Sequence, residues 1–145
     1  MAEFRFDFLL KLALDEREEA AKVLQVAQSA WLAARAKQEQ VDAFRCEYRN
    51  RLTTSGQSGM TVTQWRDFQL FLSRLDMAAK QQVEEVALHE ARYQQALEVW
   101  QACEKKVKGF DALKDRHQLT EQRKEGVREQ KQLDEFNSRQ SRSSR

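Results

Sequence analysis

The sequence predicts an all-α fold, a long two-helix antiparallel coiled-coil hairpin with an overhanging C-terminal helix. Three observations support it. The chain contains no proline and only four glycines, and its one cluster of turn residues lies at positions 53–59. Apolar residues recur at alternating spacings of three and four on both sides of that cluster. Because 33% of the residues are charged, the composition suits a narrow helical seam better than a compact core.

The first helix is predicted over about residues 4–52. Apolar residues recur in it every seven positions, and Arg17, Gln38 and Arg45 interrupt the stripe. Its two series are Ala13, Ala20, Ala27, Ala34, Val41 and Tyr48, and Leu10, Leu24 and Trp31. Because many of these side chains are small, we expect them to pack closely against aromatic residues of the second helix.

The loop is predicted at residues 53–60, and the second helix begins near Thr61. Thr61 and Gln64 have the spacing of a capping box, in which each side chain bonds the backbone N–H of the other residue. A chain that folds back at about residue 57 would place Ala13 near Cys103 and Val41 near Leu75.

The second helix is predicted over residues 61–136, and only Gln82 and His89 interrupt its apolar stripe. A strict seven-residue period of this length predicts a left-handed supercoil. We expect the pairing to end near Phe110, which leaves about 40 Å of helix without a partner in the chain. Residues 137–145, rich in serine and arginine, are predicted to be a disordered tail. The stripe is Trp65, Phe68, Leu72, Leu75, Ala79, Gln82, Val86, His89, Tyr93, Ala96, Trp100, Cys103, Val107 and Phe110.

A two-helix hairpin offers no cleft in which catalytic groups converge, so we expect neither an enzyme nor a bound cofactor. His89 and His117 lack further metal ligands at helical spacing, and we interpret them as polar register elements of the seam. Cys46 and Cys103 would lie on the order of 50 Å apart along the hairpin, too far for a disulfide. Two cysteines are also typical of a reducing cytoplasm.

Charge and hydropathy argue against nucleic acid and membrane insertion. The formal net charge is +2, with acidic and basic residues interleaved. Arg139, Arg142 and Arg145 are interpreted as part of a solvated tail rather than a phosphate-binding site. The longest apolar run, residues 8–14, is broken by Lys11 and is far too short to span a bilayer. Proteins are therefore the expected partners.

The third of each helix nearest the loop is crowded with aromatic residues. A two-stranded seam has room for only part of this set, so the remaining rings are expected to be exposed and to form a binding hot spot. The alternative is that they widen the tip of the hairpin into a local core. The set is Phe44, Tyr48, Trp65, Phe68, Phe71 and Leu72.

Three groups of residues, in order along the chain, carry a resemblance to a known family. They are Phe4-Arg5-Phe6, Leu9, Leu12, Arg17-Glu18 and Ala20-Ala21; then Glu47-Tyr48-Arg49, Gly59-Met60, Trp65, Phe71, Leu75-Asp76 and Ala78; and finally residues 129–136. With these groups, and a loop between the first and last, the chain resembles the flagellar FliJ protein family. Members of this family are soluble components of the type III export apparatus.

The resemblance implies a stalk similar to the γ-subunit of rotary ATPases. Its termini would sit in the ring of the export ATPase, FliI, and its loop end would face the export gate protein FlhA. The ATPase regulator FliH and export chaperones are further implied partners, and the place of action would be the cytoplasmic face of the membrane-bound export apparatus. By analogy, the gate-binding residues are Val41, Phe44, Tyr48, Phe71, Leu75 and Ala78. The residues expected to meet the ATPase ring are Phe110, Leu113, Leu119, Val127, Leu133 and Phe136.

Three alternatives stay open at this point. The first is the equivalent stalk of a virulence injectisome. The second is an export chaperone or chaperone-recycling protein, which would keep its apolar seam open in the free state. The third is a structural spacer that pairs with itself and forms a concentration-dependent dimer, whereas an internal hairpin predicts a monomer.

Overall fold

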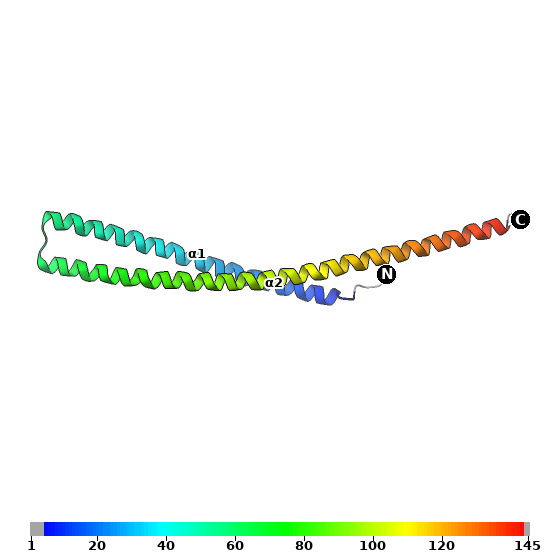
Figure 1. The fold of residues 1–145 in the computed structure, drawn as a ribbon, viewed down its shortest axis with the longest axis horizontal. Helices are drawn as coiled ribbons and strands as arrows, with labels where there is room; N and C mark the ends of the chain where they lie inside the picture. Colours follow the sequence, from blue (N-terminus) through cyan, green and yellow to red (C-terminus); the bar gives the residue numbers. More distant parts are fainter. Residues whose placement is uncertain (1–4, 144–145) are drawn as a thin grey trace. The chain divides into compact units, whose positions relative to one another are not determined.

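The computed structural model describes residues 5–143, which form two long helices and no strand. Helix α1 spans Asp7–Ser58 and helix α2 spans Val62–Ser143 (Figure 1). The helices pack against each other, so the predicted all-α helical hairpin is confirmed. The chain divides into two compact units. One is Ala20–Trp100, and the other comprises the described parts of Met1–Glu19 and Gln101–Arg145.

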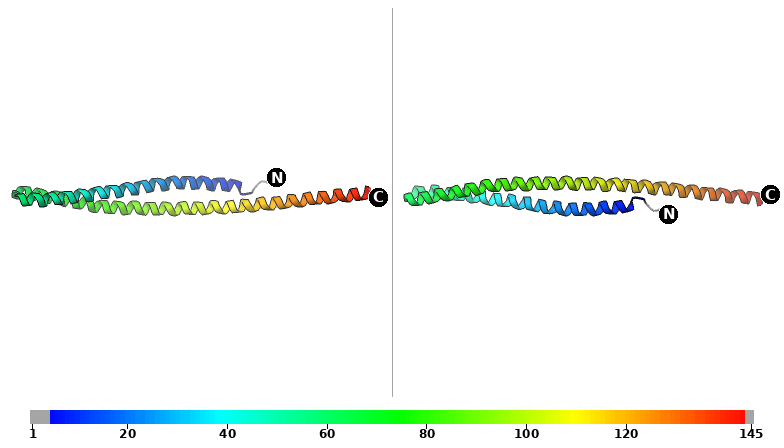
Figure 2. Two further views of the ribbon diagram at one scale, coloured as in Figure 1. Left: turned by 90° about the horizontal axis from the view of Figure 1, so that it is seen from above. Right: turned by 90° about the horizontal axis from the view of Figure 1, so that it is seen from below.

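In the unit Ala20–Trp100, α1 and α2 run antiparallel, side by side, from the turn that joins them (Figures 1 and 2). Burial follows the predicted stripes. On α2, Leu72, Ala79, Gln82 and Ala96 are buried, and the seam positions between them are half-buried. Trp65 is the exception, because this ring near the turn is exposed. The heptad pattern therefore identified the seam of this unit correctly from Phe68 onward.

The polar residue inside this seam has a defined partner. The Gln82 side-chain amide donates a hydrogen bond of 2.9 Å to the backbone oxygen of Ala34 across the seam. A buried amide without a partner would destabilise the fold, whereas this one ties one position of α2 to one position of α1. Nearby, the rings of Trp31 and Tyr93 stack with centroids 5.1 Å apart.

The small residues of α1 lie beside several kinds of residue on α2. Ala20 and Ala27 line the same groove as Ala96, and the backbone oxygen of Ala34 accepts from Gln82. Ring contacts with α2 occur at Trp31 with Tyr93, near the turn, and at Phe6 with Phe110.

The turn is shorter than predicted. Residues 53–58 are helical, and α1 ends at Ser58 rather than near residue 52. The hydroxyls of Thr53 and Thr54 donate to backbone oxygens four residues earlier, so these residues are satisfied inside a helix. Gly59, with φ at 95°, takes the left-handed conformation that ends helices. The other side of the turn has the predicted capping box, with both Thr61–Gln64 bonds at 3.2 Å.

In the second unit, the start of α1 packs against α2 around a small core of Leu10, Ala13 and Val107, which Phe110 covers. The ring of Phe110 lies 6.5 Å from that of Phe6. Ala13 thus packs with Val107, further along α2 than the predicted Cys103. The later turn explains the offset, because α1 ends at Ser58 and α2 begins at Val62, so the turn is centred at residue 60 rather than at about residue 57.

The last part of α2 continues as helix to Ser143, so the expectation of a disordered tail is wrong for residues 137–143. This segment has no helix-breaking residue, and Arg142 in the last turn interacts favourably with the helix dipole. Every residue from 122 to 143 is exposed. The predictions also concerned Phe4 and residues 144–145. Residues 1–4 and 144–145 lie outside the described residues.

Candidate functional site

The aromatic residues near the turn divide between seam and surface. Tyr48 is half-buried at a seam position of α1 and touches rings on both helices. Its ring centroid lies 4.4 Å from that of Phe71, 5.8 Å from that of Phe68 and 6.1 Å from that of Phe44. Tyr48 therefore joins the internal ring of Phe68 to the outer rings of Phe44 and Phe71.

Phe44 and Phe71 present much of their surface to solvent, with 51% and 37% of each residue exposed. Both are held by Tyr48, which limits the rotamer freedom that an isolated surface phenylalanine would have. An exposed aromatic pair that is already ordered loses less conformational entropy on binding than a free one. The loop end therefore presents two ordered aromatic rings to solvent.

The other residues of this region that the family resemblance implies in gate binding lie around the same rings. Val41 and Leu75 are half-buried in the seam, and Ala78 is exposed about two helical turns beyond Phe71. We call the six residues together the loop-end aromatic surface. They are Val41, Phe44, Tyr48, Phe71, Leu75 and Ala78.

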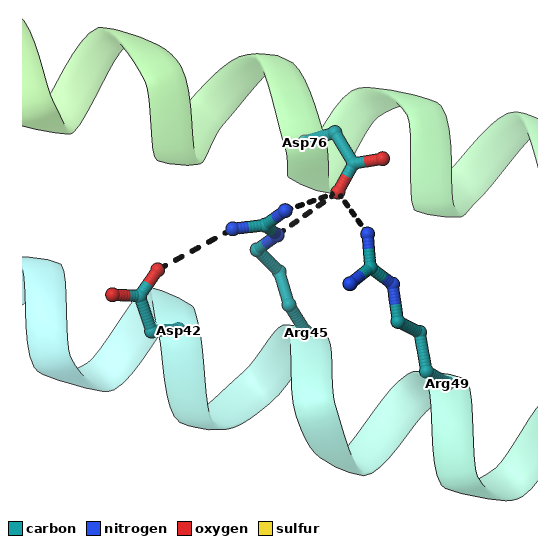
Figure 3. Close-up of polar contacts among 4 residues, drawn as sticks. All are labelled: Asp42, Arg45, Arg49 and Asp76. Carbon is teal, nitrogen blue, oxygen red and sulfur yellow. Dashed lines mark hydrogen bonds and ion pairs between the residues drawn. The ribbon is translucent and has the colours of Figure 1, made fainter.

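A charged cluster also joins the two helices at this level (Figure 3). One carboxylate oxygen of Asp76 accepts from Arg45 Nε at 2.9 Å and Nη2 at 2.8 Å, and from Arg49 at 3.2 Å. Arg45 also pairs with Asp42 at 3.5 Å. Arg49 lies about 140° from Phe44 around α1, and Asp76 lies about 140° from Phe71 around α2. The loop end is therefore aromatic on one side and ionic on the other.

A charged residue at a seam position, Arg45, could have indicated this ionic cluster in the sequence, but the predicted register paired it with the wrong residue of α2. Arg45 occupies a seam position, where a partly buried guanidinium is stabilised by a carboxylate nearby. A fold-back at residue 57 places Arg45 near Phe71, whereas the observed turn brings it to Asp76.

The residues expected to meet the ATPase ring fall into two groups. Phe110 is half-buried and packs on the core of its unit. The others lie on the C-terminal stretch, which we define as residues 111–143 of α2, and are between 40% and 58% exposed. They do not form one narrow stripe, because the helix turns about 100° per residue and their spacings of six, eight, six and three spread them around it. They are Leu113, Leu119, Val127, Leu133 and Phe136.

In their side chains and hydropathy, residues 5–143 meet the requirements of neither a metal site nor a membrane span. No group of three or more His, Cys, Asp or Glu side chains in this range is placed to hold a metal ion. His89 lies 3.6 Å from Glu85 one turn earlier. Cys46 and Cys103 are both free thiols. Over the same residues, neither helix contains a segment of sufficient length and hydropathy to cross a membrane.

The family model described as "Flagellar FliJ protein" matches residues 1–145. The chain belongs to the flagellar FliJ protein family. It is similar to the flagellar FliJ protein of Escherichia coli K12, with 26% identity over 131 residues that cover 90% of this chain and 89% of the relative. The flagellar FliJ protein of Salmonella typhi is 25% identical over the same shares of the two chains. No solved structure gives a significant match. Membership of the FliJ family makes the chain a component of the flagellar protein export apparatus.

Proposed function

We propose that this FliJ-family chain is a non-catalytic stalk that fits the ring of the export ATPase, FliI, and binds the export gate protein FlhA. The observation that carries the proposal is the pair of ordered, exposed rings of Phe44 and Phe71 on a closed two-helix scaffold. Exposed apolar residues that lie together on one surface are typical of sites that bind another protein. We assign this loop-end aromatic surface to FlhA.

The C-terminal stretch is assigned to the ATPase ring. Its apolar residues are exposed and spread around the helix, which suits a partner that surrounds a helix rather than one that packs along a single face. Contacts with FliH and with export chaperones belong to the same proposal. The proposed place of action is the cytoplasmic face of the membrane-bound export apparatus.

Two observations favour this function over its alternatives. Family membership favours the flagellar system over a virulence injectisome. The seam residues Leu10, Leu72 and Val107 are buried within a single chain, whereas a chaperone that binds clients through its seam would leave them open. The same internal pairing occupies the stripe that a self-pairing spacer would need, so a monomer is expected.

The gate assignment is tested by Phe44→Ala combined with Phe71→Ala. We expect FlhA binding to weaken by at least about 2 kcal/mol, as for central aromatic hot spots. The matched control combines Leu70→Ala and Met77→Ala, two exposed apolar residues on the side of α2 away from α1. Calorimetric titration against the cytoplasmic part of FlhA measures both, and circular dichroism verifies that helicity is kept. Equal losses in the two double variants would remove the assignment.

The ATPase assignment is tested by ending the chain after Phe110. The core of Leu10, Ala13, Val107 and Phe110 is retained, so the hairpin should persist. We expect stimulation of the export ATPase to be lost and FlhA binding to be kept. Stimulation by the shortened chain at the full-length level would contradict the assignment without affecting the gate proposal.

A further inference from the structure

A second apolar surface lies in the middle of the unit Ala20–Trp100, separate from the loop-end aromatic surface. It is an open groove of about 670 Å³ between α1 and α2. Most of its lining is apolar. The lining residues are Ala20, Lys22, Val23, Val26, Ala27, Ala30, His89, Arg92, Gln95, Ala96 and Val99.

The groove exists because both helices carry small residues at the same level. Ala27 and Ala96 occupy seam positions without filling the space beside the seam. Val23, Val26 and Val99 form its walls, and they are largely exposed. A groove between two helices, with alanine at its base and valine along its sides, has the shape that receives a third helix in a bundle.

Charge indicates the chemistry of that third helix. The charged side chains in the lining are Lys22 and Arg92, and no carboxylate lines the groove. Glu85 lies beside His89 at one end, 3.6 Å away. An isologous pair of grooves from two copies of this chain would bring their basic residues into one interface, which is unfavourable. A helix with acidic flanks is favoured instead.

We propose that this groove binds an amphipathic helix of another protein, with apolar residues at spacings of three and four and Asp or Glu on either side of them. The bound helix would place its apolar stripe on Ala27, Ala30 and Ala96, and its carboxylates near Arg92. This site does not depend on the proposed binding of FlhA or the ATPase, because it shares no lining residue with either surface.

The test uses two synthetic helices as probes and the full-length chain. Each probe has about three heptads with leucine on one stripe, and the flanking positions are glutamate in one probe and lysine in the other. Three variants are compared with the wild type. Val26→Glu places a charge in the groove at a residue that is 71% exposed, Arg92→Glu reverses a rim charge, and the control Leu32→Glu changes an exposed residue outside the groove.

We expect the glutamate probe to bind the wild type saturably and to gain helicity. Val26→Glu should weaken it at least about tenfold, which corresponds to roughly 1.4 kcal/mol. Arg92→Glu should weaken it about fivefold and strengthen the lysine probe, as expected for one reversed ion pair. Leu32→Glu should change the affinity of either probe less than about twofold.

Other outcomes overturn the proposal. Equal affinity for the two probes, no saturable binding, or equal effects of Val26→Glu and Leu32→Glu would each exclude an acidic helix in this groove. Sedimentation of the wild type and Val26→Glu at several concentrations tests the other possible occupant, a second copy of the chain. A dimer that dissociates in Val26→Glu would show that a second copy of the chain occupies the groove.

Discussion

The paired and unpaired parts of α2 belong to one continuous helix but differ in burial. Between Phe68 and Phe110 every predicted seam position is buried or half-buried. From residue 122 to Ser143 all positions are exposed, although leucine, valine and phenylalanine still occur there. Helix formation in the second region rests on local propensity and i,i+4 pairs such as Gln130 with Asp134. Packing stabilises the first region, and the second is available to a partner.

The largest expected difference comes from removing a leucine in each region. Leu72 is buried in the seam, so Leu72→Ala should lower the free energy of unfolding by about 2–4 kcal/mol. Leu133 is exposed, and Leu133→Ala should change it by less than about 0.5 kcal/mol. Chemical denaturation followed by circular dichroism measures both. Similar losses would mean that the C-terminal stretch is packed in the free protein.

A smaller effect is expected from the ionic side of the loop end. Asp76→Ala removes the acceptor shared by Arg45 and Arg49, both partly exposed, so the loss should be only about 1 kcal/mol. The loss should shrink in high salt, since screening weakens the wild-type pairs. Asp42→Ala is the control, because its contact with Arg45 lies within α1. A larger effect of Asp42→Ala would show that pairing within α1 matters more than pairing between helices.

Gln82→Leu should leave the free energy of unfolding within about 1 kcal/mol of the wild type, because an apolar side chain of similar size replaces the buried amide. We expect the substitution to affect the specificity of helix pairing instead. Without the bond to Ala34, the seam loses a contact that fixes one register. Sedimentation should then detect some association between chains. A strictly monomeric Gln82→Leu would limit the role of Gln82 to packing.

The smallest effect is expected at Gly126 in the C-terminal stretch. A Cβ atom added there meets nothing within 4 Å, so Gly126→Ala should stabilise the local helix by at most about 1 kcal/mol. Slower amide exchange in the surrounding turns would register the gain, with unchanged exchange around Leu72 as the internal control. Unaltered exchange near residue 126 would show that glycine does not limit this helix.

The seam was predictable because period and burial are linked directly. A residue at every third or fourth position must face the same side of a helix, so Leu72, Ala79 and Val107 were identified without coordinates. The exposure of aromatic residues at the loop end was predicted from their number. A two-helix seam has room for only part of the set, and Phe44 is indeed exposed.

The turn, the register and the groove were less accessible to sequence analysis. Gly56 looks like a helix breaker, yet the helix passes through it and ends at Ser58, just before Gly59, where the backbone adopts a positive φ. This difference moved the pairing and concealed the Asp76 cluster. The alanines of α1 suggested close packing against rings, but Ala96 on the partner helix leaves the space that forms the groove. Such features depend on which residues meet across the seam.

Hydrogen–deuterium exchange along α2, in the free protein and with the export ATPase, distinguishes the packed part of the helix from the exposed part. We expect strong protection around Leu72 and Ala96 in the free protein and fast exchange after residue 122. Addition of the ATPase should slow exchange in the C-terminal stretch and leave the seam unchanged. Slow exchange there in the free protein, or no change when the ATPase binds, would contradict the division of α2 into a packed part and a partner-binding part.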